Sequence, residues 1–367
     1  MSLPYEDDEI FSIGGQSLRR GEQATIMLKL PRLFDFTQLA MPVRIFRGLR
    51  PGPAIFVSGA IHGDEVIGPE IIKRVMLRLA KGKRMQGLSG TLVFVPIVNV
   101  FGFNANSRYL PDHRDLNRSF PGSKDGSLAA RVAAIFLDEV VRKCHAGIDL
   151  HSAKVNRVNL PQIRVDLSDP ITDRLARAFG APVILNSKVR DGSLREVAED
   201  LGIHMLVFEG GEGLRSNEAY VKIGVKGVIN VLREAGNLPS KKRTDEDKNN
   251  SGKDTESPEK SSFVAQTSYW LRASQSGSIR SRTHLGAIIK PDSVLAEISD
   301  PFGENIKNVK SRTSGIVIGE SLIPLINQGD ALFHIATGAK KSEITRLVEE
   351  FPDLLSWYEA EPVRDRS

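Results

Sequence analysis

The sequence predicts an α/β protein with a mostly parallel, mixed sheet that is covered by helices on both faces, followed by a small all-β domain. Between residues 51 and 236, short apolar runs alternate with longer amphipathic segments, the pattern of parallel strands connected by helices. Beyond a polar stretch, short strand-like runs are separated by turn residues. The chain has 367 residues, of which 40% are hydrophobic, so it is long enough for one large domain and a smaller one.

Each expected element follows from an apolar run or an amphipathic segment. The expected strands lie at 54–60, 91–98, 146–150, 183–186 and 205–209. The expected helices lie at about 66–80, 127–143, 170–179, 193–201 and 216–235. Two strand-like runs precede them, at 24–33 and 42–50. In sheets of this kind the chemistry collects at the carboxyl ends of the strands.

The changes in composition divide the chain into five zones. Residues 1–50 are expected to be a β lead-in, and residues 51–238 the α/β domain. Residues 239–262 contain no apolar residue and are expected to be a disordered polar linker. Residues 263–338 are expected to form the small β domain, and residues 339–367 a helical tail, because their apolar residues recur at helical spacing.

Composition and charge exclude several classes of protein. The net charge is +5, but the basic residues are scattered along the sequence and form no stripe with aromatic residues, which argues against nucleic-acid binding. No apolar run approaches the ~20 residues of a membrane span, and the first residues lack the apolar core of a secretory signal. With Cys144 as the single cysteine, no intramolecular disulfide can form. We therefore expect a cytoplasmic protein that binds neither nucleic acid nor membrane.

The segment SGAIHGDE places a histidine and a carboxylate directly after a predicted buried strand. His62 and Glu65 are three residues apart, so both side chains can lie on one side of the turn into the next helix. Such a pair can bind one zinc ion, and Gly63 lets the backbone turn sharply between them. In the alternative interpretation, Asp64 and Glu65 only favour the positive end of a helix.

Two more polar residues stand at the ends of predicted strands. His151 ends the run GIDLH and Glu209 ends the run LVFE. Alone, the first could be a core histidine and the second a turn acid. Because the strand ends should meet at one edge of the sheet, we expect His62, Glu65 and His151 to form a three-ligand metal site with an open fourth position. Glu209 is then well placed as a general base.

The stretch NANSRYLPDHRDLNRSFPG at 104–122 is dense in arginine, asparagine and aspartate and fits neither a strand nor a helix. Arg108, Arg114 and Arg118 within it could fork onto carboxylates. A solvated, charged loop is the alternative interpretation.

Taken together, these motifs resemble the succinylglutamate desuccinylase and aspartoacylase family of the zinc carboxypeptidase clan. The resemblance covers roughly residues 50–236. The matching motifs are GAIHGDE at 59–65, RDLNRSFPG at 114–122, DLH at 149–151 and FEGG at 208–211. It implies a zinc carboxypeptidase-like fold, with a C-terminal β domain like that of predicted deacylases. It also implies a zinc-dependent hydrolase that cleaves the amide bond of an N-acyl amino acid or a related acylated amine.

The resemblance also assigns roles to single residues. His62, Glu65 and His151 match the ligands of one zinc ion, and Glu209 matches the residue that activates water. Arg108 matches the arginine that polarises the scissile carbonyl group.

The remaining roles concern the substrate and the acids behind the ligands. Asn117 and Arg118 match the pair that binds the substrate carboxylate. Arg114, which we also count among the substrate-binding residues, is the alternative to Arg108. Asp115 matches an acid that orients the first zinc histidine, and we expect Asp149 to support the ligands from behind as well. The expected partner is a small acylated molecule that bears a carboxylate. Whether the chain forms a homo-oligomer is left open.

Two other functions compete with this interpretation. The same zinc site would serve a carboxypeptidase that removes the last residue of a peptide or peptidoglycan fragment. In a non-catalytic zinc-binding module, the β domain would be the working part. The complete set of ligands and base favours an enzyme over the second alternative.

Overall fold

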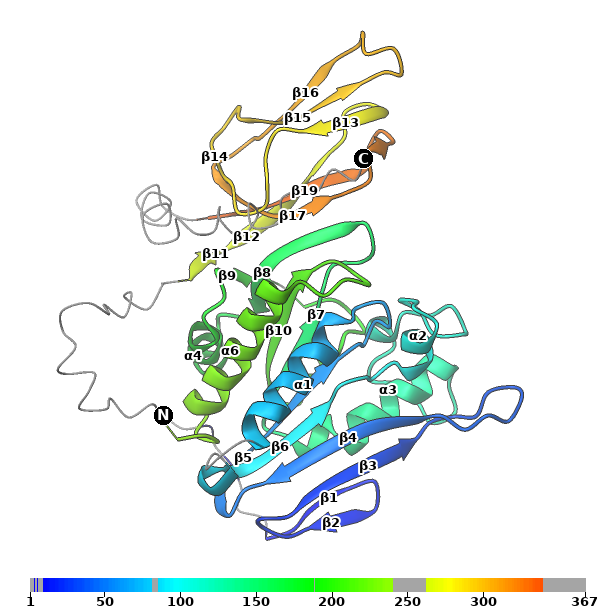
Figure 1. The fold of residues 1–367 in the computed structure, drawn as a ribbon, viewed down its shortest axis with the longest axis vertical. Helices are drawn as coiled ribbons and strands as arrows, with labels where there is room; N and C mark the ends of the chain where they lie inside the picture. The colour runs from blue at the N-terminus through cyan, green and yellow to red at the C-terminus, as the bar shows by residue number, and fades with distance from the viewer. Residues whose placement is uncertain are drawn as a thin grey trace, which may run out of the picture.

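The computed structural model describes Leu3, Tyr5 and residues 9–80, 85–187, 189–239 and 262–338. One sheet of 13 strands runs through the molecule, with helices packed against it (Figure 1). The expected tail at 339–367 lies outside the described residues, and so does the expected linker at 239–262 except for its first and last residue.

Four parallel strands form the centre of the large sheet. In spatial order they are β10 (His204–Gly211), β7 (Ala146–His151), β5 (Arg50–Gly59) and β6 (Ser89–Val95). Their apolar residues are buried on both faces, as expected for parallel strands between two layers of helices. All four carboxyl ends therefore meet at one edge, which confirms the predicted fold class.

The amino-terminal strands extend this sheet. After a small hairpin of β1 (Phe11–Ile13) and β2 (Gln16–Leu18), the chain forms β3 (Gln23–Lys29) and β4 (Ala40–Arg47). β4 pairs antiparallel with β6, and β3 pairs antiparallel with β4. The strand-like run expected at 42–50 is thus divided between β4 and the start of β5.

Helices cover both faces of the sheet. One face carries α1 (Ile67–Ala80), α4 (Pro170–Phe179) and α6 (Glu218–Glu234). The other face carries α3 (Leu128–Glu139) and α5 (Leu194–Asp200). Alternate residues of β5 belong to the two cores: Ile55 packs with the first group and Phe56 with the second.

The helix expected at 127–143 is shorter than predicted. α3 ends at Glu139, and a separate 3₁₀ turn follows at Val141–Lys143. Val140 between them has a φ of −119°, far from the value of about −63° that is typical of an α-helix. Two consecutive β-branched valines have restricted side-chain rotamers in a helix, which favours an end at this position.

The strand β8 (Arg157–Val165) was not expected from the sequence. It pairs antiparallel with β10 on one side, and on the other it pairs with β9 (Val183–Asn186) and with a strand from the C-terminal region. Its ladder with β10 is irregular, because Glu209 faces Gln162 whereas Gly211 faces Asn159. β8 thus has one residue more than β10 in this interval, which is a β-bulge.

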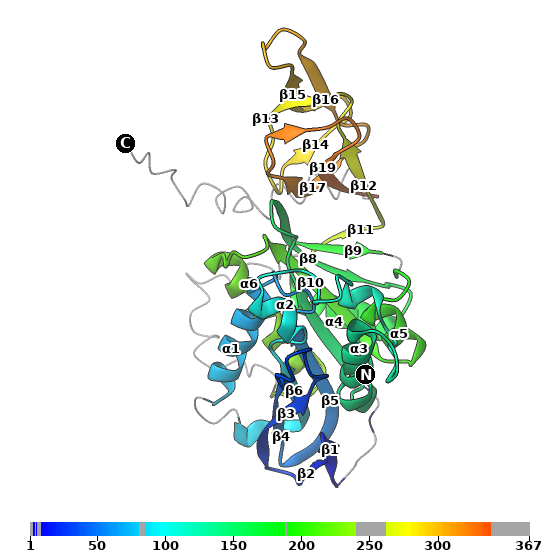
Figure 2. The ribbon, with the colours of Figure 1, turned by 90° about the vertical axis from the view of Figure 1, so that its right-hand side faces the viewer.

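The C-terminal strands divide between two sheets (Figure 2). β17 (Gly315–Ser321), β19 (Ala331–Thr337) and β12 (Thr267–Arg272) continue the large sheet beyond β8. The second sheet contains β16 (Lys307–Lys310), β15 (Val294–Ser299), β13 (Gly277–Ser281) and β18 (Leu325–Ile326). Two short strands also belong to the large sheet: β14 (Ile288–Ile289) pairs with β17, and β11 (Phe263–Ala265) pairs with β9. A third apolar core lies among these strands.

Within the described ranges, none of the helices combines the length and the apolar character that crossing a membrane requires.

Gly147 shows how tightly the parallel centre is packed. It stands in register with Phe56 on one side and Met205 on the other, and a Cβ atom there would lie 2.2 Å from the Phe56 ring. We expect Gly147→Ala to lower the free energy of unfolding by about 1–3 kcal/mol, measured by urea denaturation. Phe56→Leu in the same chain should recover part of this loss. A Gly147→Ala variant as stable as the parent would contradict this packing.

Candidate active site and metal centre

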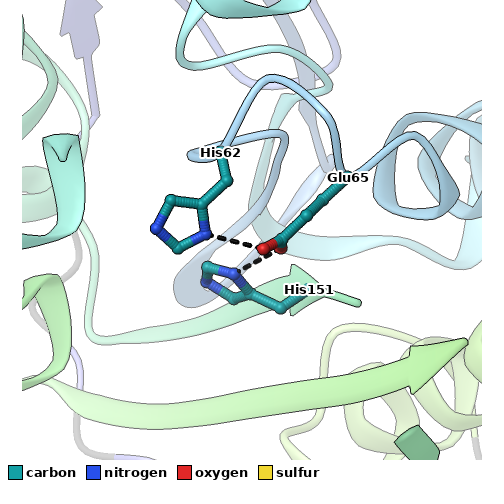
Figure 3. Close-up of side chains that lie close together, drawn as sticks. All are labelled: His62, Glu65 and His151. Carbon is teal, nitrogen blue, oxygen red and sulfur yellow. Dashed lines mark hydrogen bonds and ion pairs between the residues drawn. The ribbon is translucent and has the colours of Figure 1, made fainter. Parts of the chain in front are cut away.

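Three side chains from two strand ends converge on one point. His62 Nδ1 lies 2.7 Å from Glu65 Oε1, and His151 Nδ1 lies 2.7 Å from Glu65 Oε2 (Figure 3). One donor atom from each residue falls within 4.8 Å of the other two. All three side chains are buried. The cluster that the sequence predicted is therefore present in the structure.

Backbone geometry brings the two halves of the cluster together. After β5 ends at Gly59, Ala60 adopts a positive φ of 49°, and the chain turns toward α1. At Gly63 this turn passes so close to the short helix α2 (Val100–Asn104) that a Cβ atom would lie 2.0 Å from the Gly102 carbonyl carbon. Only glycine fits there, so the expected sharp turn at Gly63 has a steric cause.

Each imidazole is held from behind by a second carboxylate. Asp115 Oδ1 lies 2.9 Å from His62 Nε2, and Asp149 Oδ2 lies 2.6 Å from His151 Nε2. The Ser58 hydroxyl donates to the other oxygen of Asp149 at 2.8 Å. In both histidines Nε2 is therefore occupied and Nδ1 faces Glu65. This is the arrangement in which a carboxylate orients a metal-binding histidine.

The charges in the cluster suit a divalent cation. Burial lowers the pKa of His62, but Glu65 and Asp115 outweigh it and raise that pKa above its ordinary value. Burial acts on His151 in the same way, and Asp149 and Glu65 raise its pKa well above the usual range. Burial raises the pKa of Glu65, but the two histidines outweigh it and lower that pKa. The carboxylates thus stabilise positive charge at the Nδ1 atoms, and a dication supplies such charge to the same donors. Two histidines and one carboxylate form a donor set that fits a catalytic metal.

Arg108 reaches the cluster from the loop after α2. Its guanidinium lies 2.9 Å from Asp115 Oδ2 and 3.4 Å from Glu65 Oε1, and a quarter of its side chain is exposed. Burial lowers the pKa of Arg108, but Glu65 and Asp115 raise it above its ordinary value. Arg108 is therefore a permanent positive charge that faces both the cluster and the solvent.

Among the described residues, no hydrogen bond or ion pair joins Asn117, Arg118 or Arg114 directly to the three side chains of the cluster. Asn117 accepts a hydrogen bond from the backbone N–H of Leu194 at 2.9 Å, which joins the loop to the start of α5. Arg118 is exposed and donates to the Asn117 carbonyl oxygen. The Arg114 side chain is 64% exposed, and its charged group lies 4.0 Å from Asp112 rather than beside the cluster.

Glu209 lies beside His151 in the sheet. The two residues are register partners in the parallel pair β10–β7, so their side chains leave the same face on strands about 4.8 Å apart. Within the described residues, the contacts of its carboxylate go to β8. Asn159 donates to Oε2 at 2.9 Å, and the Arg164 guanidinium lies 3.3 Å from Oε1.

The sequence did not point to Asn159 or Arg164, because it gave no prediction of β8. The signal that could have found them is the alternation of Val158, Leu160 and Val165 with polar residues, which Pro161 interrupts. Two surface hollows of about 190 and 250 Å³ lie beside His145, at the amino end of β7, and no cluster residue lines either of them.

Comparison with known proteins places this geometry in a family. Residues 51–235 match the model of the succinylglutamate desuccinylase/aspartoacylase catalytic domain, which is half of the chain. The chain belongs to this family. As a member, it is a hydrolase of amide bonds other than peptide bonds.

Individual relatives match over most of their length. An N-α-acetyl-L-2,4-diaminobutyric acid deacetylase of Halomonas elongata is 26% identical over 84% of this chain and 90% of its own. The ectoine utilization protein EutE (DoeB) of Ruegeria pomeroyi, solved with bound product, covers 91% of this chain and 100% of its own, with a TM-score of 0.75 and 24% identity. A succinylglutamate desuccinylase of Silicibacter sp. TM1040 has the same coverage of both chains, a TM-score of 0.73 and 25% identity.

The hydrogen bond between Asp149 and His151 leads to a test on metal affinity. We expect Asp149→Asn to weaken zinc binding by about 10- to 100-fold, because the His151 imidazole loses a charged acceptor. A competition titration against a chromophoric chelator measures the change. Asp138→Asn is the matched control, since Asp138 pairs with Arg142 on the exposed side of α3. Equal affinities for the two variants would rule out this role.

Proposed function

We propose that the chain is a zinc-dependent deacylase that cleaves the amide bond of a small N-acyl amino acid or a related acylated amine. The observation that carries the proposal is the convergence of His62, Glu65 and His151 donor atoms within 4.8 Å. Glu209 stands in register with the second histidine. The family match and the Halomonas relative, a deacetylase of an N-acetylated amino acid, support an acylated substrate.

In this proposal, His62, Glu65 and His151 hold one zinc ion. The chemistry that zinc supplies when bound is that of a Lewis acid, which acidifies a water molecule and polarises a carbonyl group. Asp115 and Asp149 orient the two imidazoles so that each Nδ1 faces Glu65, with which they would hold the ion. The donor set, its burial and these outer carboxylates support this assignment.

Glu209 acts as the general base and then as the general acid. It removes a proton from the attacking water and returns a proton to the leaving nitrogen, so that the carbon–nitrogen bond breaks. Arg108 stabilises the negative charge that develops on the carbonyl oxygen. Its position beside Glu65, at 3.4 Å, favours it over Arg114 for this role.

Asn117 and Arg118 bind the carboxylate of the substrate. Arg118 is exposed on the same loop as Arg108, and a guanidinium binds a carboxylate with directed, charge-assisted hydrogen bonds. The side-chain oxygen of Asn117 accepts a hydrogen bond from the Leu194 backbone N–H. The side-chain NH₂ group of Asn117 can therefore donate to the substrate. A cytoplasmic location remains part of the proposal, supported by a single buried cysteine.

A substrate panel tests the proposal. The zinc-loaded protein is incubated with N-acetyl and N-succinyl amino acids, with their carboxamides and with dipeptides, and the products are identified by mass spectrometry. We expect release of the free amino acid from acylated substrates, and weaker turnover of the carboxamides, which lack the carboxylate. Cleavage of dipeptides alone would favour the carboxypeptidase alternative. Zinc binding without any hydrolysis would favour the non-catalytic alternative.

A substitution at residue 209 tests the base. Glu209→Gln should retain one zinc ion per chain and lower kcat by about 10²- to 10⁴-fold, because an amide cannot accept the proton. Glu212→Gln is the control, because Glu212 lies in the following loop and pairs with Arg215. Metal analysis and steady-state kinetics give both readouts. Normal turnover in Glu209→Gln would remove this residue from the mechanism.

A further inference from the structure

The contacts of the Glu209 carboxylate define a second layer of the site. Asn159 Nδ2 donates to Oε2 at 2.9 Å, and Arg164 Nη1 lies 3.3 Å from Oε1. Asn159 is 6% exposed, so its amide is shielded from water and its hydrogen bond is not easily replaced by solvent. Both contacts come from β8, and together they fix the direction of the carboxylate.

The β-bulge explains why Asn159 reaches Glu209. Side chains alternate between the faces of a strand, so residues 159 and 162 of a regular strand would point to opposite faces. Here Glu209 pairs with Gln162 and Gly211 pairs with Asn159, so the two residues Leu160 and Pro161 stand opposite the single residue Gly210. The extra residue brings Asn159 to the face of Glu209. Bulges commonly redirect a side chain beside an active site in this way.

The C-terminal β region, residues 262–338, packs against Asn159 from the side opposite to β10. Gly319 of β17 is the register partner of Asn159, and β19 supplies His334 on its far side. A Cβ atom at Gly319 would lie 3.0 Å from Asn159 Oδ1 and 3.1 Å from the His334 Cβ atom. Both distances are tighter than ordinary contacts, so a larger residue at Gly319 would displace the Asn159 amide.

Gln162 ties the bulge to the same strand. Its side-chain amide donates to the Ile318 carbonyl oxygen at 3.2 Å and to the Leu160 carbonyl oxygen at 3.3 Å. Gln162 is fully buried. It therefore connects the irregular part of β8 to β17 where a regular ladder is interrupted.

We propose that Asn159 is a positioning residue for Glu209, and that the C-terminal β region holds the Asn159 amide in place through Gly319. This inference rests on the proposed function, in which Glu209 is the base. It makes the C-terminal region a part of the catalytic machinery, although none of its described residues belongs to the His62–Glu65–His151 cluster. The chemistry of substrate recognition is unaffected, so the effect falls on kcat and not on KM.

Two substitutions at one position test the hydrogen bond. Asn159→Ala should lower kcat by about 10- to 100-fold, the loss expected for a hydrogen bond to a charged group, with KM and zinc content unchanged. Asn159→Asp keeps the size of the side chain but faces Glu209 with a second negative charge, so it should lose more activity than Asn159→Ala. If Asn159→Asp is the more active of the two, Asn159 only fills space and the proposal is overturned.

A pair of glycines on one strand tests the contribution of the C-terminal region. A Cβ atom at Gly315 would lie 2.4 Å from the Ala336 carbonyl oxygen, inside the C-terminal region and away from Asn159. We expect both Gly319→Ala and Gly315→Ala to lower Tm, but only Gly319→Ala to lower kcat. Equal kcat for Gly319→Ala and Gly315→Ala would contradict the proposal.

A double-substitution cycle and two reference proteins complete the test. Gly319→Ala should lower kcat less in the Asn159→Ala background than in the parent, because the amide that it displaces is already absent. Additive losses would show that Gly319 acts by another route.

An active parent with an inactive Glu209→Gln variant keeps the proposed function, whatever the Asn159 variants do. A parent that hydrolyses no acylated substrate sinks the proposed function instead.

Discussion

The site depends on the bridging of two imidazoles by the Glu65 carboxylate. A fully buried carboxylate is strongly unfavourable unless partners compensate for the lost hydration. Here both oxygens are matched by histidine nitrogens at 2.7 Å, and the Ser152 backbone N–H adds a third contact at 3.1 Å. These partners come from the turn after β5 and from the end of β7. The two strand ends are thereby held in one relative position, and the donor atoms of the three side chains are held with them.

The Glu65 bridge is the centre of a longer hydrogen-bond network in which carboxylates and imidazoles alternate. On one side of Glu65 the network runs through His62 to Asp115. On the other side it runs through His151 and Asp149 to the Ser58 hydroxyl. Asp115 also binds Arg108 and caps the 3₁₀ turn that begins at Leu116. The polar loop at 104–122 is therefore ordered by the same electrostatic partners that surround the ligands. This accounts for a charged segment that no apolar pattern explains.

The sequence was sufficient for the cluster because local patterns determine where it forms. Parallel strands bring their carboxyl ends to one edge, so polar residues after apolar runs had to meet there. β8 could not be predicted, because Pro161 interrupts its alternation of apolar and polar residues and because a bulge depends on the partner strand as well. The pairing of Gly319 with Asn159 was also out of reach, because it joins segments that are distant in the chain and no local signal encodes it. The residues that hold Glu209 could therefore be found only in three dimensions.

The shared edge of β8 has a consequence for biosynthesis. Along its outer side, residues Gln162–Val165 pair with β9, which follows soon after in the chain. Residues Arg157–Asn159 pair with β17, which leaves the ribosome much later. Until then the nascent polypeptide presents unpaired backbone donors and acceptors on the part of β8 that contacts Glu209, a surface to which strands of other chains can pair. A prematurely terminated translation product would be expected to be both inert and prone to aggregate.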